Sequence, residues 1–93
     1  MNDFDVQKAL FEYLKSSDLK SHYLKEYKDN QTLYISKRMR ESVFYKNLDK
    51  NQRTVLDKKI KAVIDEYCKV EECDTFSIFD LYNYLIKIYY DRS

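Results

Sequence analysis

Hydrophobic residues recur every three or four positions along most of this chain, which is the spacing of an α-helix that buries one face. The clearest stretch runs from Lys50 to about Lys69, and Asp49 and Gln52 have the spacing of a capping box at its start. The apolar residues that share one side of this helix are Leu56, Ile60, Val63, Ile64, Tyr67 and Val70. The pattern therefore predicts a long amphipathic helix with a defined beginning.

The polar face of the same helix carries charges of alternating sign. Asp57, Lys61, Asp65 and Lys69 follow one another at intervals of four residues. Residues four apart are neighbours on a helix, so each acid can pair with a base in water. We expect this ladder of charge pairs to use much of the basic charge in this part of the chain.

A second strong pattern covers the last part of the chain. Asp74, Thr75 or Ser77 is expected to cap a helix that continues to about Tyr90, and Ser77 and Asp80 have the spacing of a capping box. A continuous apolar arc is formed by Ile78, Leu81, Tyr82, Leu85, Ile88 and Tyr89. Tyr84 and Ile86 widen it beyond the stripe of about 100° that a surface helix needs. We expect most of these side chains to be core. The alternative hypothesis is that Tyr84, Ile86 and Tyr90 form a surface for self-association or for a partner.

The pattern toward the N-terminus predicts two shorter helices. Asp3 or Asp5 caps the first, and Ser17 or Asp18 caps the second. The apolar stripe of the first helix is Val6, Leu10 and Leu14. The stripe of the second is Leu19, Tyr23 and Tyr27.

Residues 31–48 have apolar residues on two sides of a helical projection. One side holds Ile35, Met39 and Val43, and the other holds Leu33, Phe44 and Leu48. Residues 32–36 alone, with the sequence TLYIS, also fit a short strand. We assign the segment to a helix and keep the strand as the alternative.

The chain of 93 residues contains no glycine and no proline. Tight hairpin turns prefer glycine, whereas both residues weaken a helix interior. With 44% hydrophobic and 16% aromatic residues, the sequence can bury one modest core. Together with the helical periodicity, this predicts an all-α fold. We expect a compact single domain, residues 1–93, built as a bundle of four to five short helices.

Composition also bears on where the protein works. The N-terminus carries acids and no apolar run of the kind a signal peptide needs, and no apolar segment is long enough to span a membrane. We therefore expect a soluble cytoplasmic protein.

Lysine outnumbers arginine, and tyrosine, asparagine and isoleucine are plentiful, which fits an AT-rich coding sequence. Many viruses, phages and low-GC bacteria have such sequences. A virus, phage or mobile element is our expected source, and for a virus the location would be the host cytoplasm.

Residues suited to catalysis or metal binding are few. His22 is the single histidine, and no pattern in the sequence marks it as a catalytic base. Cys68, Cys73 and His22 are three candidate ligands, fewer than the four that a structural zinc site needs. A disulfide between Cys68 and Cys73 is sterically allowed but unexpected in a reducing compartment. We expect no enzyme activity, no cofactor and no bound metal.

Residues 23–41 resemble a helix-turn-helix motif. The end of the expected second helix leads into a polar turn at KDN, and the next helix opens with Gln31 and carries Lys37 and Arg38. In such motifs, residues near the start of the second helix contact base edges and basic residues contact phosphates. Asn30 could adopt the left-handed turn conformation in place of the missing glycine. The resemblance implies a DNA-binding transcriptional regulator.

Charge is distributed unevenly along the chain. Residues 37–61 hold nine Lys or Arg and three Asp or Glu, a net of +6, while residues 62–93 hold three basic and seven acidic residues, a net of −4. The whole chain is only +1, whereas dedicated DNA-binding domains are strongly basic. We therefore expect a protein partner rather than a nucleic acid.

The expected function is that of a small non-enzymatic binding module, such as an inhibitor or regulator of a host factor. Nucleic-acid binding through residues 23–41 is the alternative. The candidate partner-binding residues are Gln31, Tyr34, Lys37, Arg38, Arg40, Phe44 and Tyr45. Phe44 is the expected anchor because aromatic side chains flanked by basic ones are enriched at the energetic centres of interfaces.

Overall fold

A computed structural model describes residues 4–90, of which 76% are helical. This confirms the expected all-α fold. In chain order the elements are α1 (Val6–Ser16), the 3-10 helix η1 (Asp18–Ser21), β1 (Glu26–Tyr27), α2 (Lys28–Arg40), α3 (Val43–Lys46), α4 (Lys50–Glu71), β2 (Thr75–Phe76) and α5 (Ile78–Tyr89). None of the helices within this described range combines the length and the apolar character that crossing a bilayer requires.

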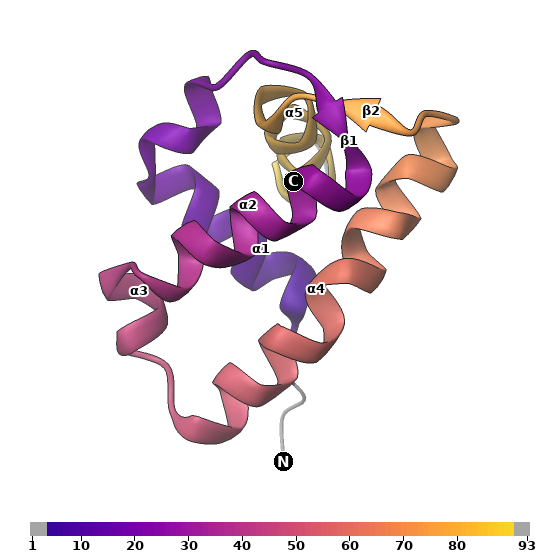
Figure 1. The fold of residues 1–93 in the computed structure, drawn as a ribbon. Helices are drawn as coiled ribbons and strands as arrows, with labels where there is room; N and C mark the ends of the chain where they lie inside the picture. The colour runs from indigo at the N-terminus through magenta and orange to yellow at the C-terminus, as the bar shows by residue number, and fades with distance from the viewer. Residues whose placement is uncertain (1–3, 91–93) are drawn as a thin grey trace.

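The helices pack around α1, which contacts both α4 and α5, while α2 lies across α4. In Figure 1, α2 crosses the front of the molecule, α4 runs along one side and α5 lies behind. The two short strands pair antiparallel, with Glu26 opposite Phe76 and Tyr27 opposite Thr75. Because β1 leads directly into α2 and β2 leads into α5, this pairing fixes the start of α2 next to the start of α5.

The hydrophobic core is continuous and draws on every helix of the bundle except the short α3. Its fully buried members, each less than 2% exposed, are Leu10, Leu14, Leu19, Ile35, Met39, Leu56, Ile64, Phe76, Ile78, Leu81 and Leu85. Aromatic pairs add specific contacts, such as the edge-to-face packing of Tyr67 on Phe76 with ring centroids 5.1 Å apart. Burial of this apolar surface is the main force that holds the helices together.

Helix starts follow the capping signals in the sequence. Asp49 begins α4 with a complete capping box to Gln52, and Ser77 begins α5 with one to Asp80. Asp5 caps α1 by accepting a hydrogen bond from the backbone N–H of Lys8 at 3.1 Å. Each cap satisfies backbone N–H groups that a helix leaves without partners at its first turn. The predicted starts of these three helices are therefore confirmed.

The predicted second helix, with its stripe of Leu19, Tyr23 and Tyr27, is wrong. Only the single turn η1 forms, and the chain is extended from His22 to β1. Leu19 is buried, but Tyr23 is 66% exposed and Tyr27 is 45% exposed. The backbone of this segment bonds to distant residues instead, since the carbonyl of His22 accepts from the N–H of Phe79 at 3.0 Å.

Residues 32–36 belong to α2, so the helical assignment is confirmed and the strand alternative is not. Ile35 and Met39 face the core as predicted, but Val43 is 71% exposed because the chain turns at Ser42 before α3 begins. On the other predicted face, Leu33 is 67% exposed. Phe44 and Leu48 are partly buried against the core. Val70 is also exposed, in contrast to the prediction that it joins the apolar face of α4.

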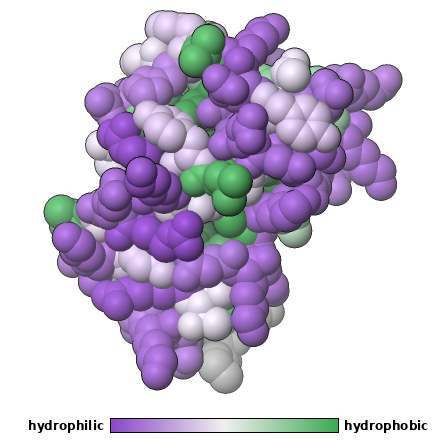
Figure 2. Space-filling model, in the orientation of Figure 1, coloured by the Kyte–Doolittle hydropathy of each residue, from purple (hydrophilic) through white to green (hydrophobic). Residues whose placement is uncertain are grey.

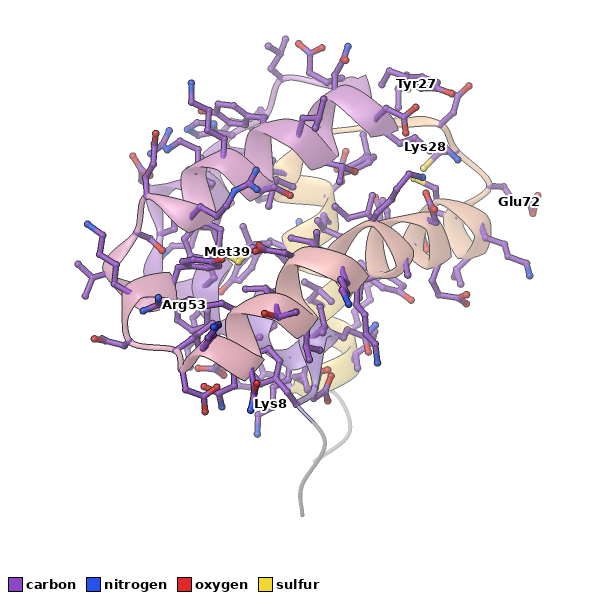
Figure 3. The ribbon with its side chains drawn as sticks, turned by 60° about the horizontal axis from the view of Figure 1, so that its bottom comes forward. Lys8, Tyr27, Lys28, Met39, Arg53 and Glu72 are labelled. Carbon is purple, nitrogen blue, oxygen red and sulfur yellow. The ribbon has the colours of Figure 1, made fainter. Side chains whose placement is uncertain are left out.

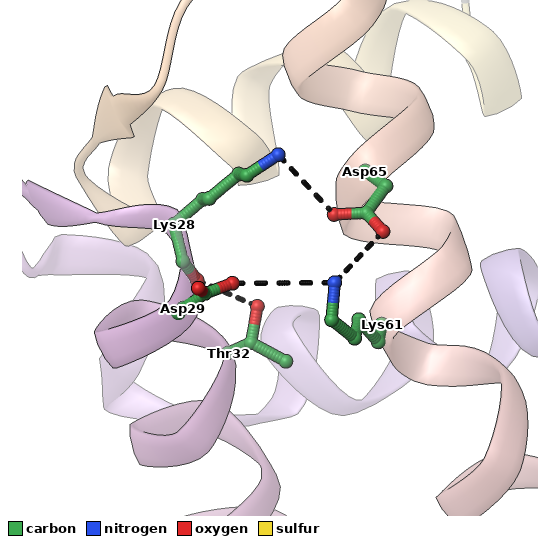
Figure 4. A network of polar contacts seen from close by, with 5 residues as sticks. All are labelled: Lys28, Asp29, Thr32, Lys61 and Asp65. Atoms are coloured by element: carbon green, nitrogen blue, oxygen red, sulfur yellow. Dashed lines mark hydrogen bonds and ion pairs between the residues drawn. The ribbon is translucent and has the colours of Figure 1, made fainter.

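The charge ladder on α4 is only partly formed within the helix. Lys61 and Asp65 pair at 3.0 Å as predicted. The same two residues also reach α2, where Asp65 lies 3.8 Å from Lys28 and Lys61 lies 4.0 Å from Asp29, as Figure 4 shows. Asp57 accepts a hydrogen bond from the Tyr45 hydroxyl at 2.8 Å. These charges therefore link helices, and each exposed pair contributes little by itself.

The end of α4 shows what the absence of glycine means for this fold. Glu72 has φ 55 and ψ 47, the left-handed conformation that glycine usually supplies after a helix. Within residues 4–90, Glu72 is the one residue with a positive φ. Asn30, for which the sequence suggested this conformation, lies inside α2. A side chain with a Cβ is disfavoured at such a position by about 1–2 kcal/mol.

Glu72→Gly is therefore expected to raise the free energy of unfolding by about 0.5–1 kcal/mol, after subtraction of the larger entropy that glycine gives the unfolded chain. Urea denaturation monitored by circular dichroism measures this change. Glu71→Gly is the matched control, since Glu71 is still helical and its replacement should lower stability by up to about 1 kcal/mol. A loss of stability in both variants would contradict the argument.

Candidate functional site

An apolar groove of about 440 Å³ lies where the extended segment after η1 passes the beginning of α2. It is lined by His22, Leu24, Glu26, Asn30, Gln31, Tyr34 and Ile78. Three separate parts of the chain thus meet here: the extended segment, α2 and the first residue of α5. The volume is within the range of about 300–1,000 Å³ that small binding sites occupy.

The floor of this groove is formed by two buried side chains, Gln31 and Ile78, which are 3% and 1% exposed. The Gln31 amide donates to the carbonyl of Phe76 at 2.7 Å and to that of Leu24 at 3.4 Å. Gln31 therefore holds the extended segment and β2 against α2. It was predicted to contact a partner or a DNA base, but its amide nitrogen is already engaged inside the protein.

The rim of the groove exposes apolar side chains. Leu24 is 72% exposed and Tyr34 is 38% exposed. The His22 ring stacks on the Tyr34 ring with centroids 6.2 Å apart. On the other side of the extended segment, Tyr23 packs on Phe79 at 4.8 Å. The rim thus combines a stacked pair of aromatic rings with an exposed aliphatic side chain.

Arg38 extends this surface along α2. Its guanidinium donates to the Tyr34 hydroxyl at 3.0 Å, lies over the Tyr34 ring at 5.8 Å and pairs with Asp18 at 3.6 Å. The hydrogen bond with Tyr34 raises the pKa of Arg38, so this group stays charged. One turn of helix separates the two residues, and they support each other's orientation.

A second groove of about 770 Å³ lies on the far side of Arg38. It is lined by Tyr13, Ser16, Ser17, Asp18, Arg38, Glu41, Ser42, Val43 and Phe44. Phe44 is partly buried and packs against Tyr13, with ring centroids 6.0 Å apart. Burial raises the pKa of Tyr13, which therefore stays neutral. Phe44 thus opens onto this groove but serves mainly to attach α3 to α1.

The remaining predicted residues of this region divide into two kinds. Tyr45 faces α4, since its hydroxyl binds Asp57 and its ring lies 5.6 Å from the Arg53 guanidinium. The hydrogen bond with Asp57 raises the pKa of Tyr45. Lys37 and Arg40 are exposed on α2. Tyr34, Lys37 and Arg38 thus lie on the outer part of α2, Arg40 lines a small cavity with Tyr45 and Asp57, and Gln31 and Tyr45 have structural contacts.

The geometry of residues 23–41 is not that of a helix-turn-helix. Residues 23–27 are extended or in β1, and the residues KDN, expected as the turn, form the first turn of α2. The helix that should precede the turn is therefore missing. Sequence reasoning also missed Leu24, because an apolar residue off the expected stripe looked like an ordinary surface position. The available signal for Leu24 was its position close to the predicted turn, in a segment with little helical periodicity of its own.

The residues suggested for self-association lie on opposite sides of α5. Tyr84 packs edge-to-face on Tyr67 at 5.0 Å, and burial raises its pKa. Tyr90 is 46% exposed and lies against α1, where its ring is 5.5 Å from Phe11 and 5.4 Å from the Lys15 ammonium. Ile86 is partly buried against the core. These contacts place Tyr84 and Tyr90 on different neighbours, and self-association remains a prediction.

Figure 2 shows the face that carries α2. Hydrophobic patches, drawn in green, lie over the middle of α2 and at the upper edge, and the surface around them is mostly hydrophilic.

Within residues 4–90, no group of three or more His, Cys, Asp or Glu side chains is arranged to hold a metal ion. No protein-family model, no curated protein and no solved structure matches this chain. The identification of this site therefore rests on its geometry.

Proposed function

We propose that this protein binds another protein through the groove beside α2 and the adjoining outer face of that helix. We name this region the α2 surface, and it comprises His22, Leu24, Leu33, Tyr34, Lys37 and Arg38. The observation that carries the proposal is the exposure of Leu24 and Tyr34, at 72% and 38%, around the apolar groove that both residues line. Clustered apolar side chains with a polar rim are typical of protein interaction sites.

The proposed occupant is an acidic segment with one apolar anchor residue. Residues 20–41, which supply most of this surface, contain six Lys or Arg and three Asp or Glu. Lys28 and Asp29 pair with α4, and Lys25 and Arg40 line other cavities, so the basic side chains of the α2 surface are Lys37 and Arg38. An aliphatic or aromatic anchor would enter the groove between Leu24 and Tyr34. Acidic neighbours would then face Lys37 and Arg38, which favours fast association.

Composition supports a narrower hypothesis about the partner. The residue usage is that of an AT-rich coding sequence, as in many viruses, phages and mobile elements. We infer a host factor as the partner, with this protein as its inhibitor or regulator.

Selection from a random peptide library displayed on phage tests the proposal. Immobilised protein is expected to enrich peptides that combine an aromatic or aliphatic residue with Asp or Glu. For a synthetic version of the enriched peptide, Leu24→Ser combined with Tyr34→Ala should weaken binding at least about tenfold, equivalent to about 1.4 kcal/mol. The matched control is Val70→Ser, since Val70 is 51% exposed on α4, away from the groove.

Two results would refute this function. One is a library selection that enriches no acidic peptide, or peptides that bind the double variant as tightly as the wild type. The other is retention of duplex DNA with an affinity that falls steeply with salt, which indicates phosphate contacts. That second outcome would favour nucleic-acid binding by the basic side chains of α2 through a geometry other than helix-turn-helix.

A further inference from the structure

Two cysteines meet at the C-terminal end of α4. The N–H of Cys73 donates to the carbonyl of Cys68 at 3.0 Å, and the N–H of Glu72 donates to that of Lys69 at 3.4 Å. These two hydrogen bonds, with Glu72 in the left-handed conformation, form a Schellman motif. In this motif the side chains at the positions of Cys68 and Cys73 come into contact across the end of the helix.

The two thiol groups have different exposure but share one environment. Cys68 is buried and Cys73 is partly buried, and both are free thiols. Both line a surface cavity that also includes Lys28 and Asp65, and Cys73 lies near enough to contribute to the raised pKa of Cys68. In Figure 3, yellow sulfur lies beside the labelled Lys28, near the end of α4 that carries Glu72. The pair therefore lies at the surface where α4, β2 and α2 meet.

Contact of this kind is what a disulfide requires. The Cα atoms of a disulfide lie about 4.4–6.8 Å apart, and cysteines held farther apart cannot be bridged without movement of the main chain. Here the hydrogen bond from the N–H of Cys73 to the carbonyl of Cys68 already holds the backbone at the two cysteines close together. Closure of a bond between the two sulfur atoms therefore needs mainly a rotation of side chains.

We propose that Cys68 and Cys73 are an oxidation site, which closes to an intrachain disulfide on reaction with a low-molecular-weight disulfide such as oxidised glutathione. This proposal is independent of the proposed binding function. The overall reaction converts two protein thiols and one glutathione disulfide into one protein disulfide and two glutathione thiols.

The more exposed Cys73 reacts first. After losing its proton to solvent, the Cys73 thiolate attacks one sulfur of oxidised glutathione, forms a mixed disulfide and releases one glutathione thiolate. Burial and the nearby Cys73 raise the pKa of Cys68 to about 11, so Cys68 is the weaker initial nucleophile. Cys68 then gives its proton to a released thiolate and attacks the sulfur of Cys73. The mixed disulfide breaks, and the second glutathione thiolate leaves and takes a proton from solvent.

The disulfide would hold a junction of three elements. Directly after Cys73, the carbonyl of Asp74 accepts a hydrogen bond from the N–H of Lys28 at 2.8 Å, at the first residue of α2. The strands β1 and β2 pair immediately beyond this bond. A covalent link from Cys68 to Cys73 would therefore restrict fraying of the end of α4 and of the strand pair attached to it.

Equilibration of the folded protein with mixtures of reduced and oxidised glutathione tests the proposal. After acid quenching and maleimide labelling, mass spectrometry is expected to show an unlabelled species about 2 Da lighter than the reduced chain, as loss of two hydrogens requires. The equilibrium constant for this species should be at least about tenfold larger for the folded protein than for the guanidinium-denatured protein, because the fold holds the thiols together.

Two variants complete the test, with circular dichroism to show that each is folded. Cys68→Ser should stop at the glutathione adduct of Cys73, and Cys68→Ser with Cys73→Ser should not react. Three results on the wild type would overturn the proposal: accumulation of the glutathione adduct, formation of disulfide-linked dimers, or an equilibrium constant for the folded protein no larger than for the denatured one.

Discussion

Replacement of Leu85 by alanine is expected to lower the free energy of unfolding by about 2–5 kcal/mol, the usual cost of such a cavity in a core. Leu85 is 0% exposed and lies in the middle of α5, on the face that packs against the rest of the core. The loss combines the transfer of the removed methyl groups with the contacts that their neighbours no longer make. Urea denaturation followed by circular dichroism at 25 °C measures it.

Leu33→Ala is the control for this prediction, because it makes the same chemical change on an exposed face. Leu33 is 67% exposed on α2, so its replacement should change the free energy of unfolding by less than about 0.5 kcal/mol. The comparison removes effects of helix propensity that both substitutions share. Similar losses in the two variants would mean that Leu85 is not in the core or that Leu33 has a buried role.

Replacement of Gln31 by alanine is expected to lower the free energy of unfolding by about 1–3 kcal/mol, the cost of leaving buried polar groups without partners. Gln31 is 3% exposed, and its amide donates to the carbonyls of Phe76 and Leu24. Without it, the extended segment loses a link to α2 and the wall of the groove loosens. Thermal and urea denaturation report the change.

The neighbouring Asn30→Ala variant separates this effect from a general effect of substitutions at the start of α2. Asn30 is exposed on the same helix, so its loss should be small. In a helix-turn-helix, by contrast, Gln31→Ala would weaken DNA binding and leave stability unchanged. A Gln31→Ala variant as stable as the wild type would contradict the role inferred from the structure.

Helices α4 and α5 illustrate what local sequence is able to specify. Their capping boxes, from Asp49 to Gln52 and from Ser77 to Asp80, lie within four residues of the chain. The buried face of α4 follows from a periodicity that any helix imposes on its side chains. Interactions over such short separations depend little on the remaining fold. The capping boxes and the buried face can therefore be predicted before the tertiary structure is known.

Residues 18–27 show where the same reasoning fails. Ser17 does cap a helical turn, accepting from the N–H of Leu19 at 3.1 Å, but the turn ends at Ser21. Helix formation competes here with pairing to β2 and with the hydrogen bond between Phe79 and His22, residues more than fifty positions apart. A helix of about ten weakly amphipathic residues is less stable than these alternatives, since short helices are marginal without tertiary packing.

The candidate site was predicted in part for the same reason. Tyr34, Lys37 and Arg38 share a helix, so their grouping follows from the sequence once α2 is assigned. The groove itself could not be predicted, because its lining comes from segments far apart in the chain. Leu24 became a rim residue and Gln31 a floor residue only when the extended segment was placed against α2 and Ile78.

The sequence by itself determined the all-α class, the capping boxes of α4 and α5, and most of the buried positions of these two helices. Each depends on side chains and backbone groups within about one or two turns of one another. Only the tertiary structure decided that residues 22–27 are extended, that Gln31 reaches Phe76 across 45 positions of the chain, and that Cys68 and Cys73 meet. In these segments a polar group can bond either to a neighbour in the sequence or to a distant residue, and the packing of the whole chain determines which of the two bonds forms.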